Sequence, residues 1–132
     1  LSPVCSGIGS GGCTSNDHGT IIINFWDTVH QYSNGTIFMR NVVHELGHAL
    51  NSFLQGAPVA ELSKANLARE RGGYAGGLHK WQFNESDTPS ENFADMFVGW
   101  TYGQWGDNKA GSLRSSFMTK WMDHYLGEIF NH

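Results

Sequence analysis

Residues 43–50 read VHELGHAL, in which His44 and His48 stand four residues apart with Glu45 beside the first histidine. On a helix of about 3.6 residues per turn, residues four apart share one face, so both imidazoles could bind a single zinc ion. Glu45 would lie to the side of such a site, close enough to take a proton from a zinc-activated water. The stretch therefore predicts a hydrolytic zinc site. The competing interpretation is an ordinary amphipathic helix that carries two histidines.

The residues around this stretch independently predict a helix over residues 36–54. Apolar side chains recur there at spacings of three and four and form one stripe, which we expect to be buried: Met39, Val43, Leu46, Leu50 and Phe53. Gly47 lies within this helix, where glycine costs about 1 kcal/mol relative to alanine, so we expect another element to approach closely there. The helix should end near Gly56 and Pro58.

A hydrolytic zinc site needs a third protein ligand and an open fourth position. The best candidate is Glu91 in the stretch SENFADMF, with Asp95 four residues later on a predicted helix. If Glu91 binds the metal, Asp95 can accept a hydrogen bond from a ligating imidazole and fix its tautomer. Two alternatives stay open: Asp95 could bind the zinc instead, or both carboxylates could lie on a solvated helix face.

The two motifs, HELGHAL and ENFADMF, together resemble those of the gluzincin metallopeptidases, with Glu91 following His48 by 43 residues. The chain most resembles the lethal-factor-like and Pro-Pro endopeptidase group, whose second motif has the form E-x-x-A-E/D-x-F. It is also similar to the ImmA/IrrE-type peptidases. The resemblance implies His44, His48 and Glu91 as zinc ligands, Glu45 as general base, and Asp95 as the partner of a ligating histidine.

One position departs from this resemblance. The lethal-factor-like enzymes carry a tyrosine seven residues before the glutamate ligand, where it helps to stabilise the oxyanion, and here that position is Asn84. Tyr74, which has glycines on both sides, or His79 could supply the missing hydrogen-bond donor from a flexible segment. The alternatives are a packed or exposed aromatic residue for Tyr74 and a surface histidine for His79.

These residues predict a zinc-dependent endopeptidase, which hydrolyses peptide bonds through a metal-activated water with Glu45 as general base. The alternative, from another class, is a non-catalytic module in which zinc staples two helices for binding or regulation. Glu45 argues against the module, because a purely structural site has no use for a base. Structural sites also tend to be closed by four protein ligands, often cysteines.

The rest of the chain predicts an α+β, mostly helical fold. The resemblance implies a minimal zincin-like fold, with an active-site helix, a second ligand-bearing helix and a small sheet. Residues 20–27, TIIINFWD, are β-branched and aromatic and predict a strand, whereas residues 1–19 are loop-like. Further helices are expected over residues 58–71, from a cap at Thr88 or Ser90 onward, and over residues 113–130 after a polar linker. We expect a single domain over residues 1–132.

Charge and hydropathy argue against two classes of partner. The 132 residues carry 8 basic and 12 acidic side chains, a formal net charge of −4, without a basic run. We therefore expect no binding to nucleic acid or to an anionic membrane surface. No apolar run approaches the roughly 18 residues of a membrane span. The expected partner is a peptide or protein substrate, bound by a monomer.

The two cysteines, Cys5 and Cys13, are separated by seven residues, of which four are glycine. Such a flexible stretch could close a disulfide, which would suit a secreted protein. Two free thiols near the terminus are the alternative. No other feature of the sequence predicts where in or outside the cell the protein is found.

Overall fold

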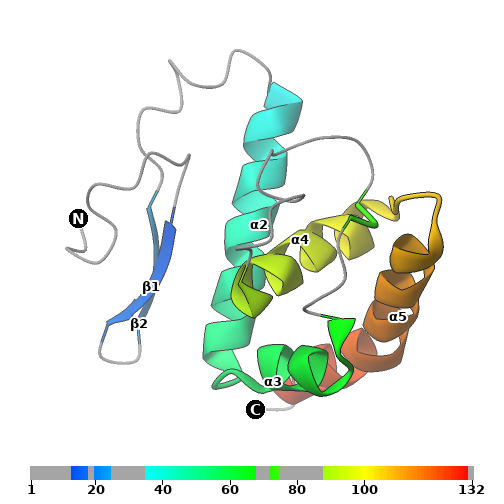
Figure 1. Cartoon of the computed structure of the whole chain (residues 1–132). Coiled ribbons are helices and arrows are strands. Elements are labelled where there is room, and N and C mark those ends of the chain that lie inside the picture. The colour runs from blue at the N-terminus through cyan, green and yellow to red at the C-terminus, as the bar shows by residue number, and fades with distance from the viewer. Residues whose placement is uncertain (1–12, 18–19, 25–34, 68–71, 75–87, 131–132) are drawn as a thin grey trace.

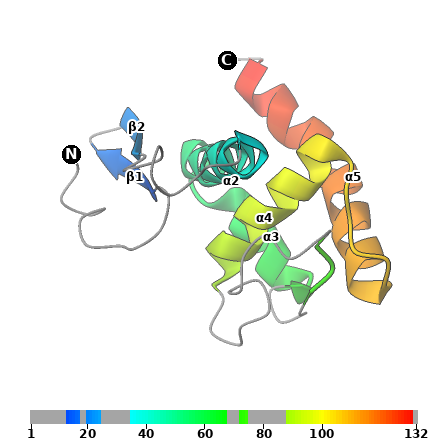
Figure 2. The same ribbon diagram turned by 90° about the horizontal axis from the view of Figure 1, so that it is seen from above.

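The computed structural model describes residues 13–17, 20–24, 35–67, 72–74 and 88–130, with side chains from residue 39 onward. These residues form two strands and four helices (Figure 1): β1 (Cys13–Asp17), β2 (Thr20–Asn24), α2 (Gly35–Phe53), α3 (Ala57–Lys64), α4 (Pro89–Tyr102) and α5 (Lys109–Phe130). The helix predicted over residues 36–54 is confirmed as α2. It lies between the β1–β2 ribbon on one side and α4 on the other (Figures 1 and 2).

Gly47 marks a close contact between α2 and α4. A Cβ atom added to Gly47 would lie 2.9 Å from Ala94 Cα and 2.9 Å from Phe97 Cβ, closer than side chains tolerate. The prediction that another element packs against Gly47 is therefore confirmed, and that element is α4. Absence of a side chain at Gly47 lets the two helix backbones come together.

The predicted apolar stripe of α2 is only partly buried. Val43 and Leu50 are buried, as expected, whereas Met39, Leu46 and Phe53 are 51%, 43% and 49% exposed. The three exposed residues are spaced by seven and lie on a neighbouring face of the helix. That part of the prediction is wrong, because the contact with α4 at Gly47 determines which face is buried, and the apolar pattern is wider than this contact.

The predicted α+β class is also wrong. The strand at Thr20–Asn24 is present, and its one partner among the described residues is Cys13–Asp17, in an antiparallel two-stranded ribbon with Cys13 opposite Asn24. Among the described residues the hydrophobic core is made by helices and the turn after α3, so the fold is mostly helical and has no sheet layer. β-Branched residues favour an extended backbone locally, but they do not specify how many strands will pair.

The ribbon changes one further prediction. Residues 13–17 form β1, although residues 1–19 were expected to be loop-like. Residues 1–12, including Cys5, and residues 25–27 at the end of the predicted strand lie outside the described residues. The Cys5–Cys13 disulfide and the extent of the single domain stay predictions.

The remaining helices begin and end at recognisable residues. Thr88 caps α4, because its side-chain oxygen accepts a hydrogen bond from the Glu91 backbone N–H at 3.2 Å. Helix α3 ends at Lys64, short of the expected residue 71, and Asn66 follows in the left-handed conformation with φ of 62°. Asn108 accepts a hydrogen bond from the Gly111 N–H, so α5 starts at Lys109, inside the predicted linker.

The core lies where α4 and α5 meet the end of α2 and α3. Its buried members come from all of these segments: Leu50, Leu62, Leu67, Phe93, Met96, Phe117, Met118, Met122 and Tyr125. None of the helices in the described part of the chain is both long and apolar enough to span a bilayer.

Replacing Gly47 by alanine should destabilise the protein. Overpacking of this kind costs about 1–3 kcal/mol, which exceeds the gain of about 1 kcal/mol in helix propensity. With an overpacking cost of about 2 kcal/mol, the middle of this range, we expect the free energy of unfolding, measured by chemical denaturation, to fall by about 1 kcal/mol. Leu46→Ala, a change at an exposed site of the same helix, serves as control and should stay within about 0.5 kcal/mol of the parent. A Gly47→Ala variant as stable as the parent would contradict the close packing of α2 on α4.

Candidate metal centre

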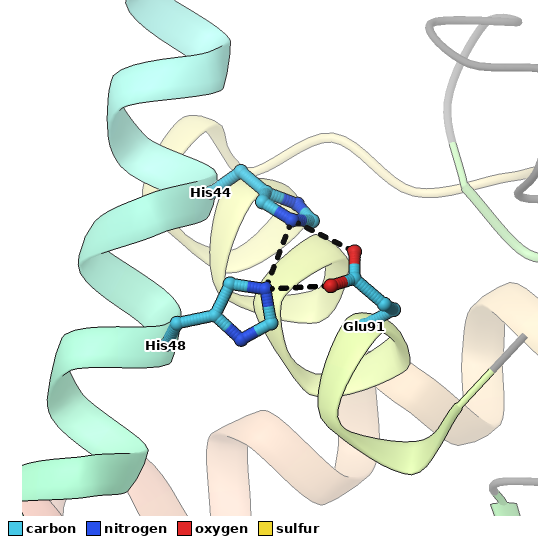
Figure 3. A group of neighbouring side chains, drawn as sticks. All are labelled: His44, His48 and Glu91. Atoms are coloured by element: carbon cyan, nitrogen blue, oxygen red, sulfur yellow. Dashed lines mark hydrogen bonds and ion pairs between the residues drawn. The ribbon is translucent and has the colours of Figure 1, made fainter. Parts of the chain in front are cut away.

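His44 and His48 project from α2 toward α4, one helical turn apart (Figure 3). His44 is buried, at 7% exposure, and the side chain of His48 is 14% exposed. The two rings meet edge to face with centroids 4.8 Å apart, and their Nε2 atoms lie 3.2 Å from each other. The spacing of four residues thus brings one nitrogen of each ring to a common point.

Glu91 reaches the same point from the first turn of α4 (Figure 3). One carboxylate oxygen lies 3.1 Å from His44 Nε2 and the other lies 3.0 Å from His48 Nε2. The Thr88 cap determines where α4 begins, and therefore which residues occupy this first turn. The two motifs, 43 residues apart in the sequence, meet in one cluster of His44, His48 and Glu91.

The donor set and its spacing fit a zinc ion. Two imidazoles and a carboxylate are a common set of protein ligands for catalytic zinc. Ligand atoms about 2.0–2.1 Å from a tetrahedral zinc lie roughly 3.3–3.4 Å apart. The separations of 3.0–3.2 Å between the three groups are close to this value. A small outward shift of each side chain would admit the ion.

The opposite nitrogen of each imidazole is held by α4. Asp95 is buried, and its Oδ1 lies 2.8 Å from His44 Nδ1, where it can accept the Nδ1–H hydrogen bond. Ser90 Oγ lies 3.1 Å from His48 Nδ1. With Nδ1 engaged in this way, each ring presents Nε2 to the cluster, and the ring orientation is set by its partner.

The structure distinguishes the two carboxylates of the second motif. Glu91 lies beside both Nε2 atoms, whereas Asp95 lies on the far side of the His44 ring. This geometry favours Glu91 over Asp95 as the third ligand. In the sequence, Ser90 is recognisable only as a candidate helix cap, because its contact with His48 depends on the direction of α4 and not on any local pattern.

Glu45, the candidate base, is buried at 6% exposure and follows His44 directly in α2. On an α-helix its side chain leaves the axis about 100° around from that of His44. Its carboxylate is not one of the three converging ligand groups. This matches a residue that stands beside a metal site without being a ligand.

The cluster is strongly coupled electrostatically. Burial by itself lowers the pKa of His44, but its hydrogen bonds to Asp95 and Glu91, and their negative charges, raise the pKa from 6.5 to about 10. Burial would raise the pKa of Glu91, but hydrogen bonds from His44 and His48 and their charges hold it well below its usual range. Without metal, protonated His44 therefore donates to both carboxylates. This contribution to stability is complete below about pH 6.5 and is lost as the pH rises toward 10.

Tyr74 lies next to α4, but its described contacts differ from those expected of an oxyanion donor. Its hydroxyl donates to Asn92 Oδ1 at 2.6 Å, and the Arg114 guanidinium lies 4.5 Å from the centre of its ring. His79 and Asn84 lie outside the described residues. The assignment of an oxyanion donor therefore stays a prediction.

In comparisons with known proteins, no protein-family model, no curated protein and no solved structure matches the chain.

Zinc binding should release a proton from His44. At pH 8 the metal-free imidazole is protonated, because its pKa is about 10. A metal-ligating imidazole must lose one proton, so about one proton per zinc should leave this residue. Titration calorimetry in buffers of different ionisation enthalpy measures this number.

Asp95→Asn supplies the matched comparison for this measurement. Loss of the Asp95 charge should lower the pKa of His44, so fewer protons should leave at pH 8. Equal proton release from the two proteins would show that Asp95 does not hold the proton on His44.

Proposed function

We propose that the chain is a zinc-dependent endopeptidase of the gluzincin type. The observation that carries this proposal is the convergence of His44 Nε2, His48 Nε2 and the Glu91 carboxylate within 3.2 Å of one another, with the buried Glu45 following His44 in the same helix. The residues that would hold zinc are the two histidines and Glu91. Peptides or proteins are the proposed substrates.

Zinc, when bound, would supply a Lewis acid that polarises the scissile carbonyl and lowers the pKa of water toward about 7. Glu45 would take the proton of the attacking water and later give it to the departing amine. Asp95 would keep the Nδ1 proton on His44, which leaves Nε2 free as a ligand atom. Ser90 would do the same for His48.

Exposure of the cluster supports a catalytic site over a structural one. The side chain of Glu91 is 39% exposed, whereas those of His44 and His48 are 9% and 14% exposed. The cluster is therefore open to solvent on the side of Glu91. Within the described residues it offers three protein ligands, the number typical of hydrolytic zinc, whereas structural zinc sites are usually closed by four.

Glu45→Gln should retain zinc and abolish hydrolysis. The amide is nearly isosteric with the carboxylate but cannot accept the proton, and loss of a general base typically costs about 10²–10⁴ in rate. Cleavage of a peptide library, with and without a chelator, gives the activity, and metal analysis gives the zinc content. Glu128→Gln on α5, where the side chain is 53% exposed, is the matched control and should behave as the parent. Normal turnover in Glu45→Gln would show that Glu45 is not the general base.

Glu91→Ala and Asp95→Ala should differ in zinc content. Loss of a ligand should leave the protein largely free of zinc at micromolar metal, whereas loss of a hydrogen-bond partner of a ligand typically costs about 10–100-fold in affinity. Competition with a chromophoric chelator measures both. If Asp95→Ala loses the metal and Glu91→Ala retains it, the ligand assignment is reversed.

The alternative of a zinc-stapled binding or regulatory module makes a different prediction in the same assays. Bound zinc with no cleavage of any library peptide would favour the module. Chelator-sensitive cleavage that depends on Glu45 would favour the peptidase.

A further inference from the structure

A chain of buried polar side chains runs from α5 to the first turn of α4. It begins at Arg114, which is fully buried. The Arg114 Nε donates to the Gly72 carbonyl at 2.8 Å, and the guanidinium lies over the ring of Tyr74. A buried guanidinium is costly unless it is hydrogen-bonded, so these contacts account for part of its placement. They hold the short described segment around Tyr74 against α5.

The backbone of this segment is also held from the other side. Gly73 accepts a hydrogen bond from the Gly106 N–H at 2.8 Å, and Tyr74 forms an isolated β-bridge with Trp105. A Cβ atom at Gly73 would lie 2.7 Å from the Ala110 carbonyl carbon, so the segment packs directly on the start of α5. The backbone and the ring of Tyr74 are thus held in place independently of its hydroxyl.

The hydroxyl of Tyr74 connects this fixed segment to α4. It donates to Asn92 Oδ1 at 2.6 Å, and Asn92 is 3% exposed. The amide of the same Asn92 side chain donates to the Thr88 carbonyl at 3.2 Å. Asn92 therefore bridges Tyr74 to the residue that caps α4.

The turn that this bridge holds carries two residues of the metal centre. Between Thr88 and Asn92 lie Ser90, which contacts His48 Nδ1, and Glu91, which contacts both Nε2 atoms. Thr88 also accepts the Glu91 N–H. A shift of this turn would therefore move the carboxylate and the hydroxyl away from the histidines together.

We propose that Tyr74 is a positioning residue for the metal centre and acts through Asn92 on the first turn of α4. This inference rests on the proposed zinc site, but it does not require that the site cleaves peptides. It gives Tyr74 a different role from that of an oxyanion donor, because a hydroxyl that donates to Asn92 in the metal-free protein has its hydrogen committed. Measurements of zinc affinity and of catalytic rate can therefore distinguish a positioning role of Tyr74 from a role as oxyanion donor.

Tyr74→Phe removes the hydroxyl and keeps the ring under Arg114. Tyr125→Phe is the control: Tyr125 is a buried core tyrosine, Tyr74 packs half-buried against the same core, and the Tyr125 hydroxyl has no hydrogen-bond partner among the described residues. Zinc affinity is measured by chelator competition. The absorption spectrum of the cobalt-substituted protein reports the ligand geometry, which a loss of overall stability alone would not change.

We expect Tyr74→Phe to weaken zinc binding about three- to tenfold, less than the roughly 10–100-fold that loss of a direct partner of a ligand costs. Its cobalt spectrum should also change. Tyr125→Phe should leave both unchanged. In the double variant Tyr74→Phe/Asn92→Ala, the two losses should be clearly less than additive, because both changes break one connection.

If Tyr74→Phe has the zinc affinity and the cobalt spectrum of the parent, the proposal is overturned. A fall in kcat in that case would indicate that Tyr74 stabilises the oxyanion instead. Losses of zinc affinity that simply add in the double variant would also overturn it. If Tyr74→Phe binds zinc more weakly but the parent protein cleaves no peptide, the positioning role is upheld and the proposed peptidase activity is rejected. A parent protein that binds no zinc would overturn both.

Discussion

The close approach of α2 and α4 at Gly47 is the constraint on which the candidate site depends. The two histidines stand on α2 and the third candidate ligand, Glu91, stands on α4, so the distance between the helices determines whether the three candidate ligand atoms can meet. With no side chain at Gly47, the backbone of α2 lies against Ala94 and Phe97. The helices pack closely enough for Glu91 to touch both imidazoles.

This packing brings ionisable groups into the interior, where they need partners. His44, Glu45 and Asp95 are each less than a tenth exposed. Burial of charge is tolerated where opposite charges and hydrogen bonds offset the loss of hydration. The His44–Asp95 and His44–Glu91 contacts provide this, and they also hold the imidazole in the orientation that a metal would require. The same contacts that make the metal-free protein stable therefore preorganise the site.

Several features could be predicted because they depend on neighbours in the sequence. The helix of the first motif and the cap at Thr88 follow from local pattern and propensity, and the helix-propensity cost of Gly47 indicated a close contact there without naming its partner. The exposure of Met39, the early start of α5 and the absence of a sheet layer from the described part of the chain were missed. The buried face of α2 was decided by its contact with α4, and the start of α5 by the Asn108 cap together with the close approach of Gly106 to Gly111. Gly111, for example, looks like part of a linker, yet it lies in α5 where a Cβ would clash with the Gly106 carbonyl.

The sequence by itself determined that His44 and His48 share one face of a helix with Glu45 beside them, because a helix repeats every 3.6 residues whatever surrounds it. It also pointed to the carboxylates of the second motif as the best candidates for a third ligand. Only the tertiary structure decided that Glu91 faces the two nitrogens while Asp95 and Ser90 support the rings from behind. The tertiary structure alone also decided that the Tyr74 hydroxyl donates a hydrogen bond to Asn92. These contacts link residues 18 to 51 positions apart, and the crossing of α2 and α4 that creates most of them is set by side-chain packing, which no local period encodes.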